Sequence, residues 1–280
     1  MSKRKPPPVP SIPGATRRLS SAEKTGRVAR SDAAWIYGHH AVLAAALNPR
    51  RHGLRLVGTP ATAAALAAAA ERGAAGRAAG PAAGPAIEVL DRRDIEKLLP
   101  PGAVHQGMAM LAEPLEEIDL GEFLTHLGEE AAARLVVLDQ ASDPRNVGAV
   151  LRSAAAFGAR AVIVQERHSP EATGALAKAA SGALEVLPMI RVTNIAQSLG
   201  ILKHAGFWCL ALSAGAPRTL AEFHPSRRLA LVIGAEGKGL RRLVETSCDE
   251  SVRIPISATI ESLNVSVAAA VVLYEFSRQR

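Results

Sequence analysis

The chain has 280 residues, 48% of them hydrophobic, and a net charge of +7 with its histidines neutral. This length allows two domains with a sizeable core, while the lack of a long apolar run or a signal-peptide pattern excludes a membrane span and favours the cytoplasm. Two cysteines exclude a disulfide framework, and no histidine or cysteine pattern has metal-binding spacing, so no metal is expected.

The N-terminal tail, residues 1–32, is strongly basic and rich in proline. It contains eight Lys and Arg residues against two acidic ones, and so carries six of the seven net positive charges. Such a composition predicts a disordered segment that binds a polyanion non-specifically. A tail that only improves solubility is the alternative.

Residues 33–112 alternate between helical and strand patterns. The sequence predicts helices at 38–48, 62–71 and 91–98, strands at 54–57, 87–90 and 105–111, and a Gly/Ala/Pro loop at 73–85. The acidic segment 113–119 contains Pro114 and resembles a linker. We therefore expect a small α/β domain that acts as a movable clamp on a second domain, residues 120–280.

The second domain begins with a predicted helix at 120–127 and a buried strand at 134–138. The next helix starts with a capping Asp143 and Pro144 and ends before Gly158, and its core stripe is Val147, Val150, Leu151 and Ala154. We further predict strands at 161–164, 184–188 and 207–212, and helices at 171–180 and 194–205.

The last fifty residues contain two strands, at 229–234 and 252–256, and helices at 240–247 and 265–276, the last nearly all apolar. Gly234, Gly237 and Gly239 follow the first strand, where ligands bind in open α/β sheets. Their spacing is not that of a phosphate loop, and Glu236 would repel a phosphate, so a neutral or cationic ligand fits better. A tight turn without a ligand is the alternative.

Three segments together resemble the SpoU (TrmH-type) family of RNA ribose 2′-O-methyltransferases, and in particular its 23S rRNA guanosine type. The motif N-x-G-x-x-x-R spans Asn146 to Arg152, the second motif spans residues 231–240, and the third combines residues 254–256 with 261–268. In the first domain, residues 37–42 and 105–107 resemble the family's L30e-like substrate-binding domain.

The resemblance implies an α/β fold whose C-terminal SPOUT-type domain, with a mostly parallel sheet, is tied in a trefoil knot. It also implies S-adenosylmethionine as cofactor, RNA as substrate and a homodimer. Gly234, Ile254, Ile256 and Leu263 would hold the cofactor, largely through backbone groups. Asn146, Arg152, Glu236 and Asn264 would line the catalytic centre.

Arg152 is the family's candidate for activating the ribose hydroxyl. A guanidinium keeps its proton in proteins, so electrostatic stabilisation of the forming alkoxide is favoured over proton abstraction. Without the family motifs, Arg152 reads as a solvated helix residue, and Asn146 and Asn264 as local helix caps.

Two alternatives to rRNA methylation stay open. The first is a tRNA ribose methyltransferase, although enzymes of that type usually lack the N-terminal domain. The second is a non-catalytic RNA-binding protein with a degenerate methyltransferase domain, against which the three intact motifs argue.

Overall fold

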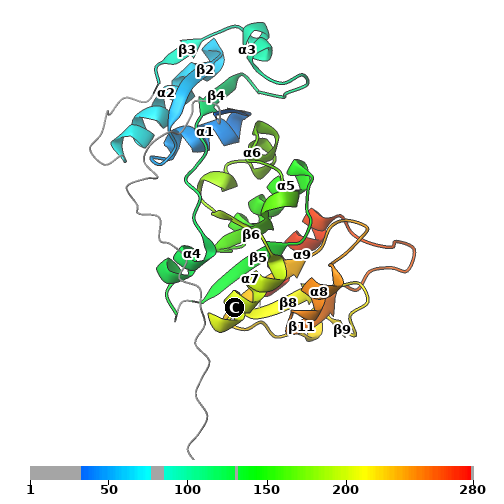
Figure 1. The fold of residues 1–280 in the computed structure, drawn as a ribbon. Coiled ribbons are helices and arrows are strands. Elements are labelled where there is room, and N and C mark those ends of the chain that lie inside the picture. The colour runs from blue at the N-terminus through cyan, green and yellow to red at the C-terminus, as the bar shows by residue number, and fades with distance from the viewer. Residues whose placement is uncertain (1–32, 77–84, 130–131, 279–280) are drawn as a thin grey trace, which may run out of the picture. The chain divides into compact units, whose positions relative to one another are not determined.

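The computed structural model describes residues 33–76, 85–129 and 132–278 (Figure 1). The basic tail, where polyanion binding is expected, lies outside the described residues, as does most of the predicted Gly/Ala/Pro loop. Within the described ranges, every helix is too short or too polar to cross a bilayer.

A four-stranded sheet forms the N-terminal part. Its strands are β1 (Ala34–Tyr37), β2 (Gly53–Gly58), β3 (Ile87–Val89) and β4 (Met108–Ala112), in the order β1-β4-β2-β3, with α1 (His39–Leu47), α2 (Pro60–Ala75) and α3 (Arg92–Leu98). β1 was not predicted. β4 starts later than predicted because residues 105–107 form a turn, in which Gln106 has a φ of 55° and Gly107 a φ of 84°.

This turn and the start of α1 bring together the two N-terminal segments that carry the family resemblance. The backbone N–H of Gly107 donates to His105 Nδ1 at 3.2 Å, and that of His39 donates to Gln106 Oε1 at 3.0 Å. The Lys178 ammonium donates to the Val104 carbonyl at 2.5 Å, and desolvation lowers the pKa of Lys178. The turn is therefore fixed from both parts of the chain.

A seven-stranded sheet forms the rest of the chain. Its strands are β5 (Ala133–Leu138), β6 (Ala161–Gln165), β7 (Met189–Val192), β8 (Trp208–Leu212), β9 (Arg218–Thr219), β10 (Arg228–Ile233) and β11 (Glu250–Arg253). The order is β7-β6-β5-β10-β8-β11-β9, and all six neighbouring pairs are parallel. The expected α/β fold with a mostly parallel sheet is confirmed.

Helices cover both faces of this sheet. Leu138 and Val136 pack into one core with α5 (Pro144–Ala156), α6 (Gly174–Ala180) and α9 (Val265–Arg278). Leu135 and Val137 pack into a second core with α4 (Leu120–Leu127), α7 (Ile195–His204) and α8 (Arg242–Thr246). Because side chains alternate along a strand, the apolar run of β5 from Leu135 to Leu138 serves both cores.

The strand predicted at 184–188 was wrong. Residues Ala183–Glu185 form a short 3₁₀ helix, and β7 begins only at Met189, after Pro188. β11 likewise ends at Arg253, two residues before Pro255, which has no N–H to continue the ladder.

A buried ion pair joins the N-terminal part to the 3₁₀ helix. Arg51 Nη2 donates to Glu185 Oε1 at 2.6 Å, Asn48 Nδ2 donates to Glu185 Oε2 at 2.8 Å, and both charged side chains are only 4% exposed. Arg51 Nη1 also donates to the carbonyl of Glu113, in the expected linker, at 2.9 Å. Moving the N-terminal part away would expose this network, which argues against the movable clamp expected from the linker composition.

Candidate active site

The helix α5 begins as its sequence signals predict. Asp143 Oδ1 accepts from the Arg145 N–H at 2.8 Å, Pro144 occupies the first turn, and the four residues of the predicted core stripe are fully buried. This start places Asn146 in the first turn, just beyond the carboxyl end of β5.

Three of the four predicted catalytic residues meet in what we term the Asn–Glu–Asn cluster: Asn146, Glu236 and Asn264. Asn264 Nδ2 donates to Asn146 Oδ1 at 3.0 Å and to Glu236 Oε2 at 3.3 Å, and Asn146 Nδ2 donates to Glu236 Oε2 at 3.4 Å. Asn264 is held in turn by Ser266, whose N–H and hydroxyl donate to Asn264 Oδ1 at 2.9 and 2.6 Å. Residues separated by up to 118 positions thus form one polar group.

Arg152 lies apart from this cluster. It is exposed on α5, and its side chain makes no hydrogen bond or ion pair with any other residue that the structure describes. It lies six positions after Asn146, which is about 9 Å along a helix axis. The structure therefore leaves its guanidinium free to meet a ligand but does not place it against the other three residues.

The loop that carries Glu236 runs from Gly234 to Leu240 and is closed at its neck. The Gly239 N–H donates to the Ala235 carbonyl at 3.0 Å, and Gly237 and Gly239 have positive φ angles of 76° and 64°. A Cβ on Gly234 would lie 2.1 Å from the Gly239 carbonyl carbon. Glycine is thus required at Gly234 by close backbone packing.

The predicted cofactor-binding residues follow strands that end at one edge of the sheet. Gly234 comes directly after β10 and Ile254 directly after β11, and both strands flank β8, so their ends are about 10 Å apart. Ile256 is 40% exposed, and Leu263 is half-buried shortly before α9. Gly234 and Ile254 thus lie at the same edge of the sheet, where their two strands end.

This edge presents the carboxylate of Glu236 together with amide groups and the backbone of a glycine loop. The loop also carries an exposed lysine, Lys238, whereas Arg241, the basic residue that follows the loop, is paired with Asp139. A sulfonium such as that of S-adenosylmethionine fits these groups, because a carboxylate nearby is favourable for a positive charge.

Gly148, within the N-x-G-x-x-x-R motif, has a packing role. A Cβ at this position would lie 2.6 Å from the Ala179 Cβ and 2.7 Å from the Leu176 carbonyl oxygen. The glycine allows α5 and α6 to approach closely, so this motif residue serves the packing of the two helices.

Sequence reasoning missed a buried polar network beside the glycine loop. Asp139, fully buried after β5, accepts from the Arg241 backbone N–H at 3.0 Å and from Arg241 Nε and Nη2 at 2.9 and 2.5 Å. Arg241 Nη2 also donates to Gln165 Oε1 at 3.0 Å. An acidic residue directly after an apolar strand was the only sequence signal for this network.

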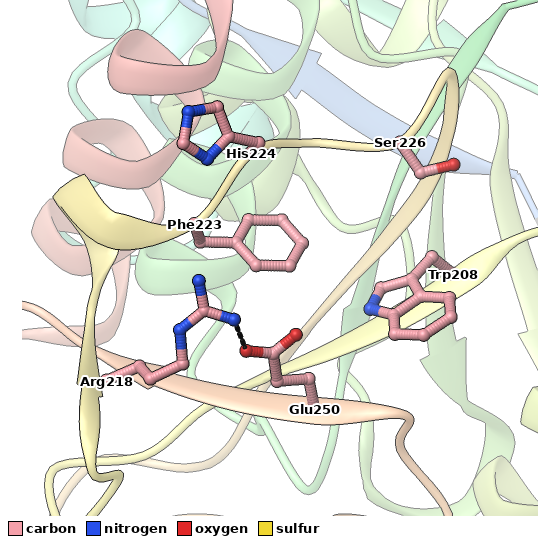
Figure 2. A pocket seen from close by; sticks show the side chains of 6 residues that line it. All are labelled: Trp208, Arg218, Phe223, His224, Ser226 and Glu250. Atoms are coloured by element: carbon pink, nitrogen blue, oxygen red, sulfur yellow. Dashed lines mark hydrogen bonds and ion pairs between the residues drawn. The ribbon is translucent and has the colours of Figure 1, made fainter.

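A surface pocket lies at the other edge of the sheet. It is lined by Trp208, Arg218, Phe223, His224, Ser226 and Glu250, and Figure 2 shows the ion pair between Arg218 and Glu250 within it. Trp208 and Glu250 begin their strands, whereas the Asn–Glu–Asn cluster lies beyond strand ends. In a parallel sheet the strand starts and the strand ends lie on opposite sides, so the pocket is separate from the candidate site.

The cysteines and metal-binding residue types supply no further chemistry. Burial raises the pKa of both Cys209 and Cys248 to about 12, so neither forms an appreciable amount of thiolate near neutral pH. Among the described residues, no three His, Cys, Asp or Glu side chains gather as metal ligands would.

Comparison with known proteins settles the family. A family model described as "SpoU rRNA Methylase family" matches residues 133–274, and a Pasteurella multocida protein named 23S rRNA (guanosine-2′-O-)-methyltransferase RlmB is 42% identical over 196 residues, covering 69% of this chain and 79% of the relative. The chain belongs to the SpoU rRNA methylase family.

Other relatives of this SpoU protein agree in sequence or in fold. A Staphylococcus aureus protein named putative TrmH family tRNA/rRNA methyltransferase is 41% identical over 179 residues, covering 64% of this chain and 72% of the relative. The crystal structure of the SpoU methyltransferase AviRb from Streptomyces viridochromogenes, in complex with its cofactor AdoMet, superimposes with a TM-score of 0.68 at 20% identity, covering 89% of this chain and 91% of AviRb. At that identity the likeness concerns the fold.

Proposed function

We propose that this SpoU protein is an enzyme that transfers a methyl group from S-adenosylmethionine to the ribose 2′-hydroxyl of a guanosine in 23S rRNA. The observation that carries the proposal is the Asn–Glu–Asn cluster, which lies beside a closed glycine loop at the carboxyl edge of the sheet. Relatives with 42% identity are named for this reaction.

In this proposal the backbone of residues 234–239 and 254–263 holds the cofactor, which supplies an electrophilic methyl group bound to a cationic sulphur. Gly234, Ile254, Ile256 and Leu263 are the contact positions. The chain's contribution is to hold the ribose hydroxyl in line with that methyl group, since alignment of reactants alone accounts for a large part of such rate enhancements.

The Asn–Glu–Asn cluster is suited to orienting the hydroxyl. Glu236 Oε2 is shared by the amides of Asn146 and Asn264, while Glu236 Oε1 accepts no hydrogen bond from the described residues. We assign Glu236 Oε1 to accept the hydrogen bond of the ribose hydroxyl. The two amides then fix the carboxylate, which takes the hydroxyl proton as the ribose oxygen accepts the methyl group, and Arg152 stabilises the negative charge that develops on that oxygen.

The domain organisation is part of the proposal. Residues 33–112 would be an L30e-like module that binds the RNA, 113–119 the linker, and 120–280 a knotted SPOUT-type methyltransferase domain preceded by the basic tail of residues 1–32. Two features support the knot: β10 is inserted between β5 and β8, and the final helix α9 returns to pack on α5. A substrate in ribosomal RNA also implies that the protein acts in the cytoplasm.

Mapping of ribose methylation tests the substrate. Total rRNA and tRNA from a strain without the gene are treated with the purified protein and S-adenosylmethionine, and the methylated nucleotides are located by mass spectrometry. We expect one new 2′-O-methylguanosine in 23S rRNA. A methyl group found in tRNA alone would show that tRNA is the substrate. Binding of S-adenosylmethionine without any methylation would favour the non-catalytic alternative.

We further propose a homodimer formed through α9. Val267, Val271 and Tyr274 follow the spacing i, i+4, i+7 and are 48%, 38% and 56% exposed, while the opposite side of α9 is buried within the subunit. An exposed apolar stripe of this kind could be buried against the same stripe of a second copy of the chain, as in a two-fold symmetric dimer.

Val271→Asp is therefore expected to convert a dimer into a monomer, because a buried carboxylate without a partner is costly at an interface. Light scattering coupled to gel filtration at micromolar concentration measures the mass. Val89→Asp changes an equally apolar residue, 55% exposed on β3, and should leave the dimer intact. A monomeric parent protein, or a dimer that survives Val271→Asp, would refute this interface.

A further inference from the structure

We infer that Asp139, Arg241 and Gln165 form a positioning network that sets the shape of the glycine loop and so aligns Glu236 with the two asparagines. This inference rests on the proposed role of Glu236 in the reaction. None of the three residues belongs to the predicted catalytic or cofactor-binding set.

The network holds the far end of the loop. The near end is fixed because Gly234 follows the central strand β10 directly, and Arg241, the N-cap residue of α8, ends the loop seven residues later. Asp139 accepts from the backbone N–H of Arg241 as well as from its guanidinium, so the carboxylate fixes both the main chain and the side chain at this point.

The two ends of the loop are coupled through its neck. The closest neighbours of a Cβ built on Gly234 are the carbonyl carbon and oxygen of Gly239 and the amide nitrogen of Leu240, at 2.1 to 2.4 Å. Leu240 is the residue before Arg241. A shift of Arg241 by a few tenths of an ångström therefore has to be taken up by the loop, because the neck has no free space.

Asp139 also ties the loop to the helix that carries Asn146. It stands four residues before Asp143, the cap of α5, and Gln140 between them has a φ of 59°, so the chain turns sharply after Asp139. The Asp139 N–H donates to the Ile233 carbonyl, the last residue of β10, at 2.9 Å. One buried residue thus anchors the segments on which Asn146 and Glu236 are carried.

Gln165 extends the network along the edge of the sheet. Its Oε1 accepts from Arg241 Nη2, and its Nε2 donates to the Thr193 carbonyl, just after β7, at 3.4 Å. The guanidinium is therefore held by acceptors from β5 and β6 at fixed separation. Holding both acceptors at once needs a planar group with donors on two sides, and the ammonium of a lysine is not planar.

The test compares Arg241→Lys in the full-length parent protein and in a Glu236→Gln background. Single-turnover methyl transfer is measured at saturating RNA and S-adenosylmethionine, together with cofactor affinity by calorimetry and the melting temperature. In the parent we expect Arg241→Lys to lower the rate about 100-fold, the scale for a reacting group misplaced by about 1 Å. In the Glu236→Gln background we expect a further loss below about threefold, because residues that act as one unit are not additive.

Gln165→Met provides a milder variant that keeps the volume and the Asp139–Arg241 pair, and it should lower the rate severalfold. Arg242→Lys is the matched control, since Arg242 is the exposed neighbour of Arg241 and its side chain makes no hydrogen bond to other described residues; only its carbonyl, which the substitution keeps, accepts from Thr246 Oγ1. It should leave the rate unchanged.

The outcomes distinguish the proposed role of Glu236 from the positioning network. An equal loss in both backgrounds, or a lower melting temperature with an unchanged rate, would mean that the network is only structural and would overturn the inference. A normal rate in Glu236→Gln alone would refute the proposed role of Glu236, and the inference with it. A slow Glu236→Gln with a normal Arg241→Lys would leave the proposed function intact and overturn the network alone.

Discussion

Arg152→Ala is expected to lower the methylation rate by about 10²–10³-fold, the scale observed when one electrostatic donor to a developing anion is removed. The same change should alter stability by no more than about 0.5 kcal/mol, because Arg152 is exposed and bonded to none of the described residues. Turnover, melting temperature and S-adenosylmethionine affinity are to be measured on the same samples. Affinity should survive, since the cofactor contacts lie on other segments.

Two further variants make this prediction specific. Arg152→Lys keeps the positive charge but loses the planar fork that can span a phosphate and a hydroxyl, so it should restore little activity. Arg160→Ala removes another exposed arginine just beyond the end of α5 and should leave turnover unchanged. Near-normal turnover in Arg152→Ala would show that Arg152 is a solvated helix residue, and a collapse in melting temperature would show that its role is structural.

Arg51→Met is expected to destabilise the protein by about 3–5 kcal/mol, the cost of leaving a buried charge without its partner. Glu185 would keep only the amide of Asn48 for its carboxylate, in a site where its side chain is 4% exposed. Urea unfolding measures the loss.

The double variant Arg51→Met/Glu185→Leu is the informative control, because an apolar pair of similar volume often replaces a buried ion pair at no cost. It should recover most of the stability lost in Arg51→Met. A single variant within about 1 kcal/mol of the parent, or a double variant no better than the single, would show that the ion pair does not hold the N-terminal part in place.

The elements with strong local signals were predictable from the sequence. The start of α5 follows from Asp143 and Pro144, and β10 follows from its unbroken apolar run. The 3₁₀ helix at Ala183–Glu185 was not predictable, because its Val-Leu neighbours resemble a strand while Glu185 is committed to an arginine 134 residues earlier. A local sequence pattern gives no information about a partner that far away in the chain.

Some residues of the candidate site were likewise predictable from the sequence and others were not. The family motifs identified Asn146, Glu236 and Asn264, and the structure brings these three together. Asp139 and Arg241 were not found, because an acidic residue after an apolar strand is a weak signal, Arg241 has no local pattern, and 102 positions separate the two. The distance from Arg152 to this cluster likewise depends on helix geometry rather than on any motif.

The insertion of β10 between β5 and β8 has a consequence for folding of the chain during its synthesis on the ribosome. When residues up to about 220 have been synthesised, β5 and β8 are both present, yet β5 has one open edge and β8 has two, because β10 and β11 are still missing. Open edges of apolar strands are prone to aggregation, and pairing over some 95 residues is slow. We therefore expect the nascent chain to need protection from aggregation until its last quarter emerges. β10, the strand that leads into the catalytic loop, then closes the gap between β5 and β8, and β11 covers the other edge of β8.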